Sequence, residues 1–169
     1  MVGMTTTGTQ TGGHGLSVSV VSRGDLPEVL RVQRAGFSRV AAALDIPVDR
    51  LPPLRETPAD LERLYDTGFR FFVARDAGVV VGTVRAEQRP DGVVEVGRLA
   101  VDDGRQRRGI GTALMRSLED SYPRARRFEL FTGAEASEPL ALYAKLGYAV
   151  FREDAEHGVR LVWLAKDRG

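Results

Sequence analysis

A glycine-rich turn in the middle of the chain has the residue types that bind anions. Its sequence is Gln106-Arg-Arg-Gly-Ile-Gly-Thr112, and an apolar helical stripe follows. The first peptide N–H groups of a helix have no partner inside the helix, and the helix dipole favours negative charge there. Glycines let oxygens of an anion approach the backbone, and Arg105, Arg107 and Arg108 add charged donors. These residues predict a phosphate or pyrophosphate site.

Two other glycine-rich phosphate motifs do not match this turn. The Gly-Lys-Ser/Thr ending of a nucleoside-triphosphate loop is absent, and so is the first glycine of the dinucleotide fingerprint. The turn is therefore expected to bind neither a nucleoside triphosphate nor NAD.

Composition narrows the chemistry further. The chain has no cysteine, which excludes disulfides, thiolate metal sites and a cysteine nucleophile, and we predict no metal site. With 24 basic and 23 acidic residues, the net charge of +1 gives no overall field that would attract nucleic acid. No apolar run reaches the roughly 20 residues of a membrane span, and the N-terminus does not resemble a signal peptide. We expect a cytoplasmic protein.

The elements that hold the turn follow from hydrophobic periodicity and turn residues. The 169 residues correspond to one domain. Residues 1–15, mostly Thr and Gly, are predicted to be a disordered tail, and residues 16–169 a single domain. The predicted strands are 16–21, 69–75, 79–88, 93–101, 128–131, 148–152 and 159–164. The predicted helices are 25–44, 57–68, 109–121 and 137–146, with a proline-rich loop at 46–56.

Three motifs in this order resemble the GNAT superfamily of acetyl-coenzyme A-dependent acetyltransferases. They are Arg98-Leu-Ala-Val101 at a strand end, Gln106-Arg-Arg-Gly-Ile-Gly111, and Leu142-Tyr-Ala-Lys-Leu-Gly-Tyr148. The resemblance extends from Leu16 to about Lys166. It implies an α+β fold: a mixed, mostly antiparallel twisted sheet of about seven strands flanked by four helices. The coenzyme would occupy a cleft where the fourth and fifth strands diverge.

The resemblance assigns coenzyme-binding roles. Backbone amides of the glycine-rich turn would hold the pyrophosphate, and the pantetheine arm would run along the end of strand 93–101, where Gly97 fits a β-bulge. The chain lacks the asparagine that many members carry before the tyrosine, and Ser137 would supply only part of that contact. The predicted coenzyme-binding residues are Leu99, Ala100, Val101, Gln106, Arg107, Arg108, Gly109, Ile110, Gly111, Thr112 and Ser137.

The resemblance also suggests how an acetyl group would move from acetyl-coenzyme A to a primary amine. Tyr143 would be the general acid for the leaving thiolate, and Glu95 the general base, directly or through water. A backbone N–H near Leu99 would stabilise the oxyanion. In simpler interpretations, Tyr143 belongs to the helix core, Glu95 forms an ion pair, and solvent deprotonates the amine. Attack would be direct, because the chain has no cysteine and no serine in a nucleophile setting.

Three alternatives stay open at this level: another acyl-coenzyme A as donor, a non-catalytic acyl-coenzyme A sensor, and nucleic-acid binding through the arginine clusters, which the net charge disfavours. The acceptor pocket would be walled by the first two helices, their loop and the final hairpin. Its residues, including Phe37, Arg55, Glu56 and Tyr65, do not distinguish a small amine, an amino acid, an antibiotic, or a protein N-terminus or lysine. A homodimer is possible.

Overall fold

One sheet organises the chain. The computed structural model describes residues 10–12, 15–105, 108–156 and 158–168. The strand order is β1-β2-β3-β4-β5-β6-β8-β7, and every neighbouring pair is antiparallel except β5 and β6. The strands are β1 (Gln10–Gly12), β2 (Leu16–Val20), β3 (Arg70–Asp76), β4 (Val79–Gln88), β5 (Val93–Val101), β6 (Arg127–Gly133), β7 (Ala149–Glu156) and β8 (Val159–Asp167).

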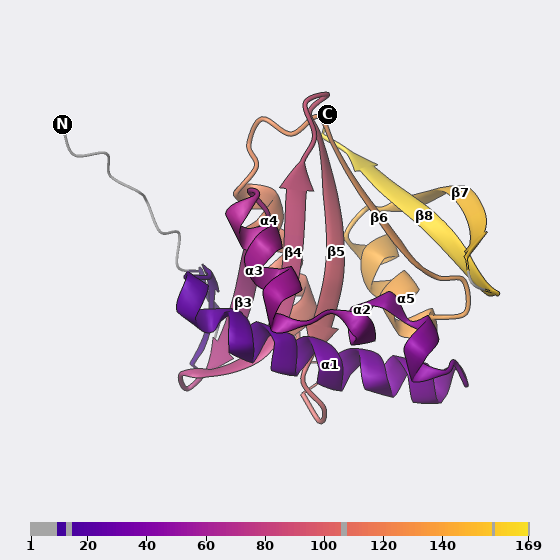
Figure 1. Ribbon diagram of the computed structural model, residues 1–169. Helices are drawn as coiled ribbons and strands as arrows, with labels where there is room; N and C mark the ends of the chain where they lie inside the picture. Colours follow the sequence, from indigo (N-terminus) through magenta and orange to yellow (C-terminus); the bar gives the residue numbers. More distant parts are fainter. Residues whose placement is uncertain (1–9, 13–14, 106–107, 157, 169) are drawn as a thin grey trace.

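Helices cover both faces of the sheet (Figure 1). The α-helices are α1 (Leu26–Ala43), α2 (Pro52–Arg55), α3 (Pro58–Asp66), α4 (Ile110–Asp120) and α5 (Ser137–Lys145), with 3-10 turns at Arg23–Asp25 and Val48–Arg50. On one face, Leu114 and Leu118 of α4 pack against Phe72 of β3 and Val94 of β5. On the opposite face, α1 and α3 form a second apolar cluster with the sheet.

The predicted α+β fold is confirmed, with two additions. The eighth strand, β1, lies within the segment expected to be a tail, where Gln10–Gly12 pairs with β2. The other addition, α2, is one helical turn inside the predicted proline-rich loop. Proline fits there because it occupies the first position of that turn, where a missing N–H costs nothing. Within the described residues, no helix combines the length and the apolar character needed to cross a membrane.

The parallel pair β5 and β6 opens a gap in the sheet. The two strands pair only between Val93–Glu95 and residues 127–129, and then separate toward α1 (Figure 1). Beyond the gap, α1 passes close to the end of β5, since a Cβ on Gly36 would lie 2.9 Å from the Cβ of Ala100. The diverging strands and the crossing helix therefore surround the space that most of the described predicted site residues line.

A bulge on β5 lies beside this opening. Arg85 of β4 pairs with Gly97 and Thr83 pairs with Ala100, so β5 has one extra residue between these pairs. The expected bulge is confirmed, but the residue with a left-handed backbone conformation is Arg98, with φ of 58°, and not Gly97. A bulge redirects side chains and leaves its peptide groups outside the regular ladder. This part of β5 can therefore present both side chains and amides to a ligand.

Candidate active site

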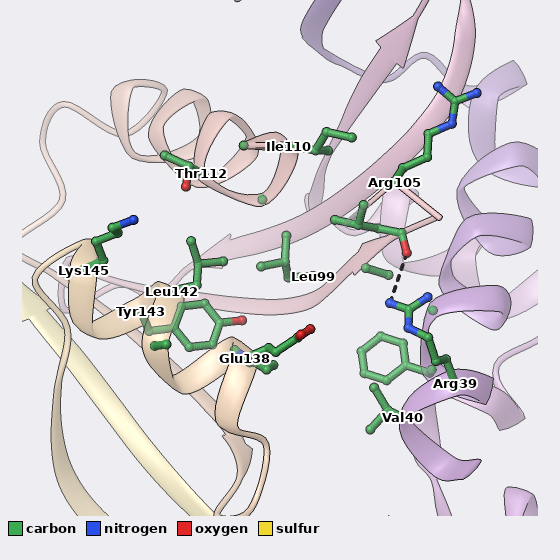
Figure 2. A pocket seen from close by; sticks show the side chains of 18 residues that line it. Arg39, Val40, Leu99, Arg105, Ile110, Thr112, Glu138, Leu142, Tyr143 and Lys145 are labelled. Atoms are coloured by element: carbon green, nitrogen blue, oxygen red, sulfur yellow. Dashed lines mark hydrogen bonds between the residues drawn. The ribbon is translucent and has the colours of Figure 1, made fainter. Parts of the chain in front are cut away.

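A cavity of about 650 Å³ lies between the middle of α1, the end of β5, the N-terminus of α4, and α5 (Figure 2). It brings together most of the residues that the sequence predicted. Those lining it are Leu99, Ala100, Val101, Gly109, Ile110, Gly111, Thr112 and Tyr143. Arg108 is exposed next to the cavity lining. Gln106 and Arg107 lie outside the described residues.

The N-terminus of α4 forms the part of this cavity suited to an anion. Gly109 is the N-cap residue with φ of 76°, a left-handed conformation that glycine adopts without strain. It has no side chain to accept hydrogen bonds from the first-turn amides of Ile110, Gly111 and Thr112, which also have no acceptor inside the helix. Several N–H groups and the positive end of the helix dipole therefore point toward one region.

The remaining walls fit a thioester coenzyme. Gly111 leaves the backbone of α4 uncovered at the cavity, where a Cβ would meet only Leu142 at 3.0 Å and Leu99 at 3.9 Å. The end of β5 contributes Leu99 and Val101, whose polar backbone can pair with an amide-containing arm. On the facing helix, Arg39 donates from Nη2 to the carbonyl oxygen of Val101 at 3.5 Å (Figure 2). The donor set matches a diphosphate linked to an amide-containing chain.

Tyr143 points from α5 into this cavity (Figure 2). Its side chain is buried, and its ring packs edge-on against Tyr148 with 6.0 Å between ring centroids. Burial raises the pKa of the Tyr143 hydroxyl far above its ordinary value. The hydroxyl therefore keeps its proton at neutral pH and faces the cavity as a hydrogen-bond donor.

The comparisons with known proteins agree with this geometry. The family model described as Acetyltransferase (GNAT) family matches residues 40–148, which is more than half of the chain. The chain belongs to this family. It is therefore an acyltransferase that uses acetyl-coenzyme A as cosubstrate. Among curated proteins, none matches it in sequence.

Solved structures share the fold of this acetyltransferase. PaiA N-acetyltransferase from Thermoplasma acidophilum, in complex with coenzyme A, is 17% identical with a TM-score of 0.75, covering 90% of this chain and 99% of its own. The ribosomal-protein-S18-alanine N-acetyltransferase from Escherichia coli is 16% identical with a TM-score of 0.74, covering 90% and 93%. The ribosomal-protein-alanine N-acetyltransferase from Brucella melitensis is 21% identical with a TM-score of 0.70, covering 89% and 99%.

Besides Arg108, two predicted site residues of the acetyltransferase lie outside the cavity lining. Ser137 is exposed at the first position of α5. Glu95 is partly exposed on β5, where its Oε1 accepts from Arg89 Nη1 at 2.8 Å. The structure therefore does not bring Glu95 beside Tyr143, and the roles of Glu95 and Ser137 stay predictions.

A second cavity, of about 330 Å³, adjoins the first. Residues lining both are Phe37, Val40, Leu99, Pro139 and Tyr143. The walls come from α1, the segment 46–53, the bulge of β5, β6, α5, the end of β7 and the start of β8. Most of these elements agree with the predicted walls of the acceptor pocket, but the second predicted helix, α3, is not among them. Of the four residues named for those walls, Phe37 lines the cavity, whereas Arg55, Glu56 and Tyr65 do not.

A buried ionic cluster lies beside the second cavity, and local sequence patterns do not indicate it. The Glu56 carboxylate accepts from Arg85 Nη1 at 2.9 Å and Nη2 at 2.6 Å, and from Gln33 Nε2 at 2.6 Å. Arg98 donates to Glu56 Oε1 from Nε at 3.3 Å and Nη2 at 3.1 Å. Burial opposes ionisation of Glu56, but the hydrogen bonds and charge of Arg85, together with Gln33 and Arg98, lower its pKa below the ordinary value.

Proposed function

We propose that the enzyme transfers the acetyl group of acetyl-coenzyme A to a primary amine by direct attack in a ternary complex. The supporting observation is that the two cavities share Tyr143 and Leu99. A coenzyme entering from α4 and an amine entering from the second cavity would meet at these residues. The family membership supports acetyl transfer, and the shared wall supports simultaneous binding of both substrates.

The amides at the N-terminus of α4, with Arg108 nearby, would hold the diphosphate. The end of β5 would pair with the pantetheine arm and orient the thioester toward Tyr143. The coenzyme supplies an activated acyl carbon. At the bulge, residues 98 and 99 have no partner in the register of β4 and β5, and a backbone N–H there would stabilise the developing oxyanion.

The bond changes balance with two proton transfers. The neutral amine nitrogen forms a bond to the acetyl carbon while the carbon–sulfur bond breaks. The leaving thiolate takes a proton from the Tyr143 hydroxyl, and the amine gives up one proton to a base or to solvent. The raised pKa of Tyr143 keeps the donor protonated across the physiological pH range.

Tyr143→Phe tests the acid assignment. We expect kcat to fall by about 10- to 1000-fold, because the thiolate loses its proton donor. The Kd of acetyl-coenzyme A should change by less than about twofold, since only a hydroxyl is removed. Steady-state kinetics and calorimetry measure these quantities. Tyr65→Phe, which removes a hydroxyl outside both cavities, is the control. An unchanged kcat in Tyr143→Phe would assign protonation of the leaving thiolate to solvent.

Glu95→Gln separates the two possible bases. If Glu95 accepts the amine proton through water, kcat/KM of Glu95→Gln at pH 7 should be about 100-fold lower than that of the unmodified enzyme. Because Glu95 pairs with Arg89 and lines neither cavity, a relay of water would be required. Loss of less than about threefold would assign deprotonation to solvent, since an ordinary ammonium has a pKa of about 10 and its neutral fraction rises with pH. The pH dependence of kcat/KM provides the measurement.

The comparisons leave the acceptor open. Two of the similar structures are named for ribosomal-protein alanine, but identities of 16% and 21% show a shared fold alone. A preference for acetyl- over propionyl- and succinyl-coenzyme A is likewise a proposal, and competition among the three in one turnover assay tests it. The class of acceptor must be argued from the second cavity.

A further inference from the structure

The ionic cluster beside the second cavity has more positive than negative groups. Its side chains are largely shielded from solvent: 10% of Arg85, 14% of Glu56 and 19% of Arg98 is exposed. Among the described residues, Glu56 is the one acidic residue that forms an ion pair with either arginine. Two guanidinium groups therefore share a single carboxylate. Burying an uncompensated charge is unfavourable, so this cluster can gain a second anion at low cost.

The two arginines are not equivalent. Both terminal nitrogens of Arg85 donate to the two oxygens of Glu56, which satisfies the guanidinium fork. Arg98 reaches only the Oε1 atom that Arg85 already occupies. Burial and the charge of Arg85 lower the pKa of Arg98, while Glu56 raises it in part. The surplus positive charge therefore belongs mainly to Arg98.

Arg98 is also the member of the cluster that lines the second cavity. It occupies the bulge of β5 with a backbone φ of 58°, a conformation that residues other than glycine rarely adopt. Its chain neighbour Leu99 lines both cavities. The residue with the surplus charge therefore lines the cavity from which the amine would approach, and it is next in the chain to a residue that lines both cavities.

The rest of the cavity is mainly apolar. Its other charged lining residues are Arg50 and Glu156, both at exposed positions. The apolar lining includes Leu44, Ile46, Leu51, Leu130, Val159 and Leu161. A ligand that fits these walls needs an apolar body and one anionic group close to the reacting nitrogen.

We propose that the acceptor is a free α-amino acid with an apolar side chain, and that Arg98 binds its carboxylate. The proposal rests on the amine-acetylating function proposed above. One carbon separates the amine of an α-amino acid from its carboxylate, so a carboxylate bound by Arg98 would keep the amine inside the second cavity. The carboxylate takes no part in the bond changes; Arg98 positions the acceptor while its amine attacks the acetyl carbon.

Paired acceptors test the proposal on the unmodified enzyme. L-leucine, L-leucinamide and 3-methylbutylamine share the apolar group and the amine, and only L-leucine has a carboxylate. We expect kcat/KM for L-leucine to exceed that of the other two by about 10- to 100-fold, the contribution of a charged hydrogen-bonded pair. Equal values, or preference for the uncharged acceptors or for a peptide N-terminus, would overturn the proposal and leave amine acetylation intact.

In Arg98→Met, the preference for L-leucine over the two uncharged acceptors should fall to less than about threefold. Arg98→Lys should retain part of this preference, because lysine keeps the positive charge but lacks the planar guanidinium group. Arg160→Met is the matched control: Arg160 lies between the cavity-lining Val159 and Leu161 but does not line the cavity. The control should keep the full preference. Equal losses on all three acceptors in Arg98→Met would indicate a purely structural role and overturn the proposal.

A binding measurement keeps the proposal independent of turnover. Calorimetry compares N-acetyl-L-leucine with N-acetyl-L-leucinamide, each titrated into the enzyme with saturating coenzyme A. Tighter binding of the acid, lost in Arg98→Met, supports the carboxylate site even if no amine is acetylated, a result that would reject only the proposed function. Equal binding of the two compounds overturns the site. Should Arg98→Met fail to fold in a thermal melt, Arg98→Lys and the comparison on the unmodified enzyme decide.

Discussion

Gly111→Glu is expected to raise the Kd of acetyl-coenzyme A by at least about 1000-fold, beyond calorimetric detection. Gly111 lies in the first turn of α4 and lines the larger cavity. A carboxylate there would face the coenzyme's diphosphate. Two unit charges about 4 Å apart repel by about 4 kcal/mol at an effective dielectric constant of about 20, which corresponds to about a 1000-fold change in Kd.

The same substitution should leave the fold intact. A glutamate in the first turn of a helix interacts favourably with the helix dipole, and replacing glycine in a helix improves its propensity. The nearest atom to a new Cβ is a terminal methyl of Leu142 at 3.0 Å, which can move by rotation of its side chain. We therefore expect Tm to stay the same or rise.

Gly111→Gln separates charge from size. Glutamine has nearly the same shape without the charge, so crowding alone predicts similar losses of affinity in both variants. We expect the loss in Gly111→Gln to be only about tenfold, equivalent to about 1.4 kcal/mol. Identical Kd values for the two variants, or a Gly111→Glu enzyme that binds like the unmodified one, would remove the diphosphate from the N-terminus of α4.

The features of the site that the sequence predicts are those encoded locally. The N-terminus of α4 follows from adjacent glycines before an apolar stripe, because capping and helix periodicity depend on near neighbours. The bulge was predicted to within one residue. Glycine is the residue that most readily adopts a left-handed conformation, so Gly97 was the natural candidate, but tertiary contacts of the Arg98 side chain with Glu56 accompany the positive φ at Arg98 instead.

The features that the sequence did not predict depend on contacts between distant segments. Glu56 and Arg98 are separated by 42 positions, and no short-range pattern indicates that they meet. The short strand β1 was missed because Thr- and Gly-rich residues give no apolar alternation, yet pairing with β2 supplies backbone hydrogen bonds that do not depend on side chains. The second cavity likewise requires α1, β5 and β8 to be assembled before its lining exists.

Glu56→Gln is expected to lower the free energy of unfolding at pH 7 by about 3–5 kcal/mol, the usual cost of removing one partner from a buried ion pair. The variant leaves Arg85 and Arg98, both largely shielded from solvent, without an anion. The glutamine oxygen still accepts a hydrogen bond, but it no longer balances either charge. Urea unfolding measures the difference. Glu62→Gln is the matched control, since Glu62 is 54% exposed and its nitrogen–oxygen distance to Arg23 is 4.0 Å; we expect a change within about 0.5 kcal/mol.

The pH dependence identifies the charge of Glu56 as the cause. Its pKa is lower in the folded protein than in the unfolded chain, where an ordinary glutamate has a pKa of about 4.3. Its contribution to stability is therefore complete well above about pH 4.3 and is lost as the pH falls through the lowered folded-state value. The gap in unfolding free energy between the unmodified enzyme and Glu56→Gln should be largest at neutral pH and should narrow in acid. A gap that keeps the same size as the pH falls below about 4.3 would attribute the loss to packing, because a contribution from the charge of Glu56 must shrink once the unfolded carboxyl begins to take up its proton.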